Sequence, residues 1–206
     1  MNKVIDPDRT APVAAPSAAV APAISPVRLA HVVLRTSKFD ELLRWYRSVL
    51  CADVAFSNGH IAFLAYDDEH HRIALIQVPG LQAQPAGICG VHHIAFTYAS
   101  LGDLVATYER LEGLGIRPVW CVNHGPTTSM YYADPDGNQV ELQIDNCATV
   151  EEAGAFFFTP AFESNPIGVD FDPADLARRF RAGEDEAAIK QRPPSGPRGV
   201  DGINLR

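Results

Sequence analysis

Two stretches of the chain repeat one pattern of apolar and polar positions, at an offset of 62 to 63 residues. Each stretch opens with an apolar, β-branched run that predicts a strand, first LAHVVL and then HHIAF. Each continues with the start of a helix, at Ser37-x-x-Asp40 and at Ser100-x-x-Asp103. There the serine side chain can cap a free backbone N–H while the acid reaches back. We therefore expect the same strand–helix unit twice.

Each predicted helix is followed by three further strand-like runs. Apolar positions at helical spacing mark one face of each helix: Leu42, Trp45, Tyr46 and Val49, then Leu104, Tyr108, Leu111 and Leu114. Gly113 and Gly115 are expected to end the second helix. The strand-like runs are DVAF, HIAFLAY and RIALIQV, then RPVWCV, TTSMYYA and NQVELQI. A tight turn is expected at residues 134–137 (DPDG), because Pro suits its second position and Gly its fourth. The predicted order is βαβββ, twice.

This repeat predicts an α+β fold in which two βαβββ modules, residues 27–80 and 90–146, pair into a cup-shaped mixed sheet. Neither module can bury a sheet face alone, but two together can enclose a cavity with their helices outside. The predicted domain spans residues 27–148. Residues 1–26, rich in Ala and Pro, are expected to be a disordered tail. Residues 149–206 are expected to add two short outer helices and a second loose tail at RPPSGPRGVDG.

The composition argues against two classes of partner. The 206 residues are 47% hydrophobic and 20% charged, as in an ordinary globular protein. The net charge of -8 leaves no cluster of Lys and Arg for nucleic acid or for an anionic membrane surface. No apolar run is long enough for a membrane span and no secretory signal is evident, so we expect a cytoplasmic protein. The four cysteines, without a C-x-x-C pair, are expected to be reduced core thiols: Cys51, Cys89, Cys121 and Cys147.

Three ionisable residues lie at positions that predict a metal site. His31 lies in the first strand-like run of copy one, and His93 is its equivalent in copy two. Because side chains alternate along a strand, equivalent positions in two related sheets point toward the same cavity. Glu141, between Val140 and Leu142, faces either solvent or that cavity. Taken singly, each is better explained as a core histidine or a solvated glutamate. Together, two imidazoles and a carboxylate suit a metal ion.

The paired βαβββ pattern, with His on each first strand and Glu on the last, resembles the vicinal oxygen chelate superfamily over about residues 27–146. A longer motif resembles the type I extradiol ring-cleaving dioxygenases. It runs Val122-Asn123-His124, five residues, Met130-Tyr131, two residues, Asp134-Pro135-Asp136-Gly137, three residues, Glu141. This resemblance implies that His124 and Tyr131 contact the substrate hydroxyls and that His71, just before RIAL, is a further catalytic histidine. Loop histidines and a packed strand tyrosine remain the alternative interpretations.

Position 74 separates this family from others on the same fold. Aligning HRIALI with NQVELQ places Ala74 where Glu141 falls. Glyoxalase I and methylmalonyl-CoA epimerase resemble this chain in outline, but they place a fourth ligand, Glu or Gln, there. Two His and one carboxylate without a fourth protein ligand leave open positions, which suits non-haem Fe(II) and oxygen. Many extradiol enzymes carry a second, metal-free pair of modules, and this chain has one pair.

The resemblance implies a non-haem Fe(II)-dependent extradiol dioxygenase, with Mn(II) possible, that cleaves a catechol-type ring with O2. The expected partners are a small aromatic diol, O2 and further copies of the chain in a homo-oligomer. Trp120 and the run Phe156–Phe158 are expected near the substrate pocket. The competing hypotheses are a metal-dependent isomerase or lyase of the glyoxalase kind and a non-enzymatic protein that binds a small molecule such as an antibiotic.

Overall fold

The protein is described by a computed structural model that covers residues 23–82, 85, 87 and 89–203. Residues 1–22 of the predicted N-terminal tail lie outside the described residues. The first module contains β1 (Val32–Thr36), α1 (Phe39–Leu50), β2 (Asp53–Ser57), β3 (Ile61–Ala65) and β4 (Ile73–Gln77). The second contains β5 (His93–Thr97), α2 (Leu101–Gly113), β6 (Trp120–Asn123), β7 (Thr127–Ala133) and β8 (Gln139–Asp145). The predicted order, βαβββ twice, is confirmed.

Each module builds its own mixed sheet. The first sheet has the strand order β1-β4-β3-β2, and the second has the order β5-β8-β7-β6-β9. The first strand of each module runs parallel to the last, and the remaining neighbours are antiparallel. The α+β class is therefore confirmed. In the described chain, β1 and β5 are edge strands of separate sheets, and no ladder of hydrogen bonds joins them.

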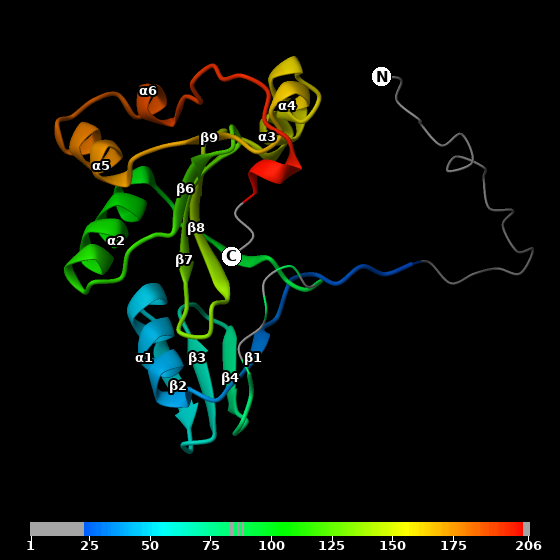
Figure 1. The fold of residues 1–206 in the computed structure, drawn as a ribbon, viewed down its shortest axis with the longest axis vertical. Helices are drawn as coiled ribbons and strands as arrows, with labels where there is room; N and C mark the ends of the chain where they lie inside the picture. Colours follow the sequence, from blue (N-terminus) through cyan, green and yellow to red (C-terminus); the bar gives the residue numbers. More distant parts are fainter. Residues whose placement is uncertain (1–22, 83–84, 86, 88, 204–206) are drawn as a thin grey trace, which may run out of the picture.

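The helices cover one face of each sheet, because their apolar stripes match the alternation of the strands. Leu42, Tyr46 and Val49 of α1 are fully buried with Ile73 and Leu75 of β4. In the second module, α2 covers the corresponding face of β8 (Figure 1). The sheet faces turned away from α1 and α2 are not covered by either of these helices, and we call them the open faces, although Tyr131 and Glu141 on the second one are buried. The prediction that Leu114 extends the buried stripe is wrong, since α2 ends at Gly113 and Leu114 is 59% exposed.

The two predicted helix caps have different outcomes. Ser100 caps α2, because its Oγ accepts a hydrogen bond from the Asp103 backbone N–H. The cap predicted at Ser37 is wrong: α1 begins after Lys38 and has no side-chain cap. The backbone N–H of Lys38 donates instead to Oγ1 of Thr36, at 2.8 Å. The tight turn between β7 and β8 is confirmed, with the Gly137 N–H donating to the Asp134 carbonyl.

That turn also joins the two modules. The buried Tyr46 hydroxyl of α1 donates to Oδ2 of Asp134, at 3.2 Å. Lys38 donates to the Pro135 carbonyl and lies 3.6 Å from Oδ1 of Asp136. These contacts hold α1 beside the second module, so both helices lie on the same side of the two sheets (Figure 1).

The C-terminal extension is more ordered than the sequence predicts. It has four short helices where two were expected: α3 (Val150–Phe156), α4 (Pro160–Ser164), α5 (Pro173–Arg181) and α6 (Glu186–Lys190). It also contains β9 (Val169–Asp170), which pairs antiparallel with β6 and becomes the edge strand of the second sheet. A 3-10 helix, Val200–Gly202, follows. The segment after α6 has little regular structure, yet the Arg198 guanidinium donates to the Gly168 carbonyl and to Asp170.

The structure also bears on the predictions about membrane spans and cysteine thiols. No helix among the described residues is long and apolar enough to cross a membrane. All four cysteines are free thiols, as expected. Only Cys121 is buried, however, and Cys51 and Cys89 are exposed, so the prediction that they all belong to the core is wrong.

Candidate functional site

Glu141 is a buried carboxylate on the open face of the second module. It alternates along β8 with Val140 and Leu142, which are fully buried beneath α2, so its side chain points the opposite way. It is only 4% exposed. A buried charge is costly unless it is paired, so its partners matter.

The partner of Glu141 is His93, the first residue of β5. His93 Nε2 lies 2.9 Å from Oε2 of Glu141. Burial acts to raise the pKa of Glu141, but hydrogen bonds from His93 and Ser129 and the nearby imidazoles outweigh it. The net pKa of this carboxyl lies below its usual range, so Glu141 is a carboxylate at neutral pH.

His124 and Tyr131 form a second pair beside the first. His124 lies in the loop between β6 and β7, and its Nε2 is 3.0 Å from the Tyr131 hydroxyl and 3.9 Å from Oε1 of Glu141. Burial lowers the pKa of His124, partly offset by the Ile167 carbonyl. Burial and the charge of Glu141 raise the pKa of Tyr131. At neutral pH this site therefore holds a neutral imidazole and a protonated phenol.

Trp120 stacks on the ring of Tyr131, with 4.8 Å between ring centroids. Phe156 of α3 packs against Gly125, which follows His124 in the same loop. The approach is so close that a Cβ atom at Gly125 would lie 2.4 Å from the Phe156 ring. Phe158 is 91% exposed. Of the aromatic residues expected near the pocket, the structure thus brings Trp120 and Phe156 to the His124 region.

His31 and His71 lie together in the first module. His31 directly precedes β1, where the sequence placed it within the strand, and its ring is 4.4 Å from the ring of His71. His71 also stacks on Phe63 of β3, with 4.6 Å between ring centroids. The Arg72 guanidinium donates to the carbonyls of Leu29 and Ala30 and so holds the chain just before His31. Burial, then the charges of His31 and His70, lower the pKa of His71.

The predicted site residues therefore fall into two groups. His93, Glu141, His124 and Tyr131 form one group in the second module, and His31 and His71 form the other in the first. Among the residues that the structure describes, no three His, Cys, Asp or Glu lie close enough together to hold a metal ion.

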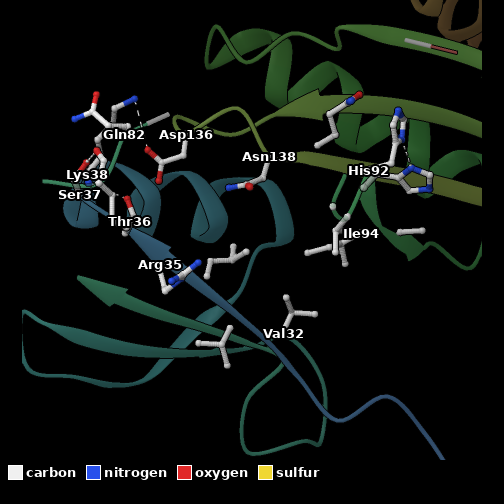
Figure 2. A pocket seen from close by; sticks show the side chains of 18 of the residues that line it. Val32, Arg35, Thr36, Ser37, Lys38, Gln82, His92, Ile94, Asp136 and Asn138 are labelled. Carbon is white, nitrogen blue, oxygen red and sulfur yellow. Dashed lines mark hydrogen bonds and ion pairs between the residues drawn. The ribbon is translucent and has the colours of Figure 1, made fainter. Parts of the chain in front are cut away.

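A cavity of about 900 Å³ lies between the edge strands β1 and β5 of the two modules. Figure 2 shows Val32 and Ile94 on opposite sides of it, with Lys38 and Asp136 at one end and His92 at the other. His93 also lines it. Its volume is in the range of pockets that bind small organic ligands.

The position of Ala74 agrees with the sequence alignment. In the first sheet Ala74 pairs with Val33, two residues after His31, and in the second sheet Glu141 pairs with Ala95, two residues after His93. Ala74 is thus the structural equivalent of Glu141, and an alanine offers no metal ligand.

The C-terminal extension contributes to this site in a way that the sequence did not predict. The Ile167 carbonyl accepts a hydrogen bond from Nδ1 of His124, and Arg192 donates to the carbonyls of His124 and Asn165. Neither residue belongs to a periodic pattern. Only the density of Asn, Pro and Gly around residues 165–168 could have indicated a tight turn there.

The sequence of this chain is similar to those of a known protein family. Residues 28–142 match the model of the Glyoxalase/Bleomycin resistance protein/Dioxygenase superfamily. Biphenyl-2,3-diol 1,2-dioxygenase 2 of Rhodococcus globerulus is 46% identical over 157 residues, which are 76% of this chain and 83% of that protein. Biphenyl-2,3-diol 1,2-dioxygenase 3 of the same organism is 44% identical over 80% of this chain and 88% of its own length.

Among solved structures, a glyoxylase/bleomycin resistance protein/dioxygenase domain from Frankia sp. EAN1pec aligns with 60% of this chain and 99% of its own. Its TM-score is 0.49 and its sequence identity is 21%. The match to the family model and the identity to the two Rhodococcus enzymes decide the family. The chain belongs to the glyoxalase/bleomycin resistance protein/dioxygenase superfamily.

Proposed function

We propose that this protein is an extradiol dioxygenase that opens the ring of a biphenyl-2,3-diol or a related catechol with O2. The observation that carries the proposal is the placement of the His93–Glu141 pair against the His124–Tyr131 pair on one open face. The sequence prediction of a ring-cleaving dioxygenase agrees with both Rhodococcus relatives, whose names state this activity.

The chemical types of the expected ligands suit a divalent metal ion, and the described structure brings two of the three, His93 and Glu141, together. Glu141 is a buried carboxylate beside the imidazole of His93, and this pair with a second imidazole is a donor set suited to Fe(II), or alternatively Mn(II). We assign the second imidazole to His31. In the structure His31 lies beside His71 in the first module, so its assignment rests on the sequence equivalence of His31 and His93. Bound there, such an ion would lower the pKa of the diol hydroxyls.

His124 and Tyr131 supply the polar chemistry around the substrate. In the structure the Tyr131 hydroxyl donates to Nε2 of His124. A diol that binds between them would replace this hydrogen bond, so that Nε2 would accept a proton from a diol hydroxyl and the Tyr131 O–H would donate to a substrate oxygen. His71 is assigned a similar proton-transfer role from the first module, because it lies against His31. The cavity between β1 and β5, which His93 lines, is large enough for the second ring of a biphenyl diol.

Oxygen uptake and product absorbance test the proposal. The protein is reconstituted with Fe(II) under anaerobic conditions and mixed with 2,3-dihydroxybiphenyl, catechol or a hemithioacetal as the glyoxalase substrate. We expect one O2 consumed per diol, a yellow ring-opened product and no turnover of the hemithioacetal. Turnover of the hemithioacetal without oxygen uptake would instead establish a glyoxalase-like enzyme. Light scattering on the same preparation measures the expected homo-oligomer.

A matched pair of variants locates the metal. Glu141→Gln keeps the size of the side chain but removes the charge, and Gln143→Glu adds a carboxylate on the same face two residues further along β8. We expect Glu141→Gln to lose bound iron and the Gln143→Glu protein to retain it. Retention of stoichiometric iron by Glu141→Gln would remove Glu141 from the ligand set.

A further inference from the structure

The C-terminal extension reaches the candidate active site through one histidine. Nδ1 of His124 is hydrogen-bonded to the carbonyl of Ile167, two residues before β9. A carbonyl oxygen can only accept, so Nδ1 carries the hydrogen. In the neutral imidazole the other nitrogen, Nε2, is then the acceptor, and it points at the Tyr131 hydroxyl, 3.0 Å away, and toward Glu141. The extension therefore determines which nitrogen of His124 faces the site.

The Ile167 carbonyl is held in place by a buried asparagine. Asn165 is 2% exposed, and its Oδ1 accepts hydrogen bonds from the backbone N–H groups of Ile167 at 3.1 Å and Gly168 at 2.7 Å. Its Nδ2 donates to the Gly168 carbonyl and to Oγ of Ser195. Every polar atom of this side chain is thus used to shape the turn that presents the Ile167 carbonyl to His124.

The turn also depends on close approach to β6. Gly168 has φ +126, and a Cβ there would lie 2.4 Å from the Asn123 carbonyl oxygen. No other residue type fits this position without strain. Glycine thus lets the extension lie directly against the strand that leads into His124.

Arg192, beyond α6, connects the two loops. Its guanidinium donates to the carbonyl of His124 at 3.1 Å and to the carbonyl of Asn165 at 2.8 Å. It also lies over the ring of Phe156, 5.6 Å from the centroid. One planar side chain therefore fixes the distance between the His124 loop and the turn that carries its hydrogen-bond acceptor.

We propose that the C-terminal extension is part of the catalytic site, with Asn165 and Arg192 as positioning residues that hold His124 with Nδ1 protonated and Nε2 facing the substrate. The inference rests on the proposed function, in which His124 accepts a proton from the diol. In that step the hydroxyl O–H bond of the diol breaks and an N–H bond forms at Nε2. Without the extension, His124 is free to rotate or to change tautomer, and Nε2 no longer faces the diol as an acceptor.

Two substitutions of the same chemical type test this role. Arg192→Gln removes both hydrogen bonds that join the loops. Arg179→Gln removes a guanidinium from α5 of the same extension, where it pairs with Glu184 instead. We expect Arg192→Gln to keep its iron and its KM but to lose roughly 10-fold to 100-fold in kcat, less than deletion of an acid–base group. Arg179→Gln should stay within about twofold, because partly exposed ion pairs contribute little.

Asn165 provides a second test with a conservative rescue. Asn165→Asp keeps the Oδ1 acceptor for the two backbone N–H groups, whereas Asn165→Ala removes it. We expect kcat to fall in Asn165→Ala and to be partly restored in Asn165→Asp. Equal kcat values for the two variants would contradict the assigned role of the turn.

The readout that does not depend on activity is the tautomer of His124. In the full chain labelled with ¹⁵N-histidine and loaded with diamagnetic Zn(II), the ring-nitrogen shifts should show hydrogen on Nδ1 of His124. Arg192→Gln should shift this signal toward a mixture of tautomers, and Arg179→Gln should not. Hydrogen on Nε2 in the parent protein, or an Arg192→Gln protein with unchanged kcat and unchanged shifts, would overturn the inference. Should the tautomer respond as expected while no diol is cleaved, the positioning role stands and the proposed function falls.

Discussion

Removal of the Tyr131 hydroxyl isolates one hydrogen bond at the candidate site. Tyr131 is 2% exposed, its hydroxyl lies 3.0 Å from Nε2 of His124, and Glu141 is close enough to raise its pKa. Tyr131→Phe keeps the ring that stacks on Trp120 and deletes only the oxygen. A buried hydrogen bond beside a charge contributes about 1.5–3 kcal/mol. If the bond forms to the reacting oxygen only in the transition state, kcat falls roughly 10-fold to 150-fold.

The assay compares kcat, KM and iron content of the reconstituted proteins on 2,3-dihydroxybiphenyl. We expect iron and KM to be retained while kcat falls by the stated factor. Because the pKa of Tyr131 is raised, the phenol stays protonated, so the factor should be constant between about pH 6 and pH 9. A factor that vanishes within this range would mean that tyrosinate is the active form.

The neighbouring tyrosine is the matched control. Tyr132 points the opposite way along β7, into the core beneath α2, where its hydroxyl lies 4.0 Å from Sδ of Met130. Tyr132→Phe should leave kcat unchanged and alter only stability. The reasoning is refuted if Tyr131→Phe cleaves the diol as fast as the parent, or if it loses its iron, since the hydroxyl would then support the metal rather than the substrate.

Three further outcomes are expected. Iron content, measured by mass spectrometry after anaerobic reconstitution, should fall to background in His93→Ala, and full retention would exclude His93 as a ligand. In urea unfolding, Ser100→Ala should lower the free energy of unfolding by about 1 kcal/mol, because the Ser100 side chain caps α2. Ser37→Ala should change it by no more than about 0.5 kcal/mol, because Ser37 does not cap α1. Tyr46→Phe should cost about 1.5–3 kcal/mol at neutral pH by removing a buried hydrogen bond to the Asp134 carboxylate.

The last of these costs should depend on pH. Burial raises the pKa of Asp134 in the folded protein above its ordinary value of 3.8. The folded state therefore becomes less stable relative to the unfolded state as the pH rises through the folded pKa and the buried carboxyl becomes charged. The hydrogen bond from the Tyr46 hydroxyl to the charged carboxylate offsets part of this loss. The cost of Tyr46→Phe should therefore shrink as pH falls through the Asp134 pKa. A cost that grows on acidification would contradict this interpretation.

The sequence by itself determined the two βαβββ modules, because hydrophobic periodicity is a local property that a strand or helix must satisfy wherever it packs. The same alternation placed Glu141 on the face opposite Val140 and Leu142. It also made Ala74 the equivalent of Glu141, which the strand registers bear out. These inferences required only the period of a strand and the internal repeat.

Tertiary structure alone decided which side chains meet. Ser37 and Ser100 have the same local sequence pattern, yet only Ser100 caps a helix, because the backbone at Thr36 offers Lys38 a different acceptor. His31 and His93 are equivalent in sequence, but the separation of the two sheets leaves His31 beside His71.

The contact of the C-terminal extension with His124 is the least predictable feature of the site. It joins residues 43 and 68 positions apart in the chain through backbone carbonyls, which every residue carries and no sequence pattern marks. Asn165 and Arg192 lie in irregular segments, where neither the period of a helix nor that of a strand constrains the side chain. The orientation of His124 is therefore a property of the folded chain, since it depends on where the extension returns to the second sheet.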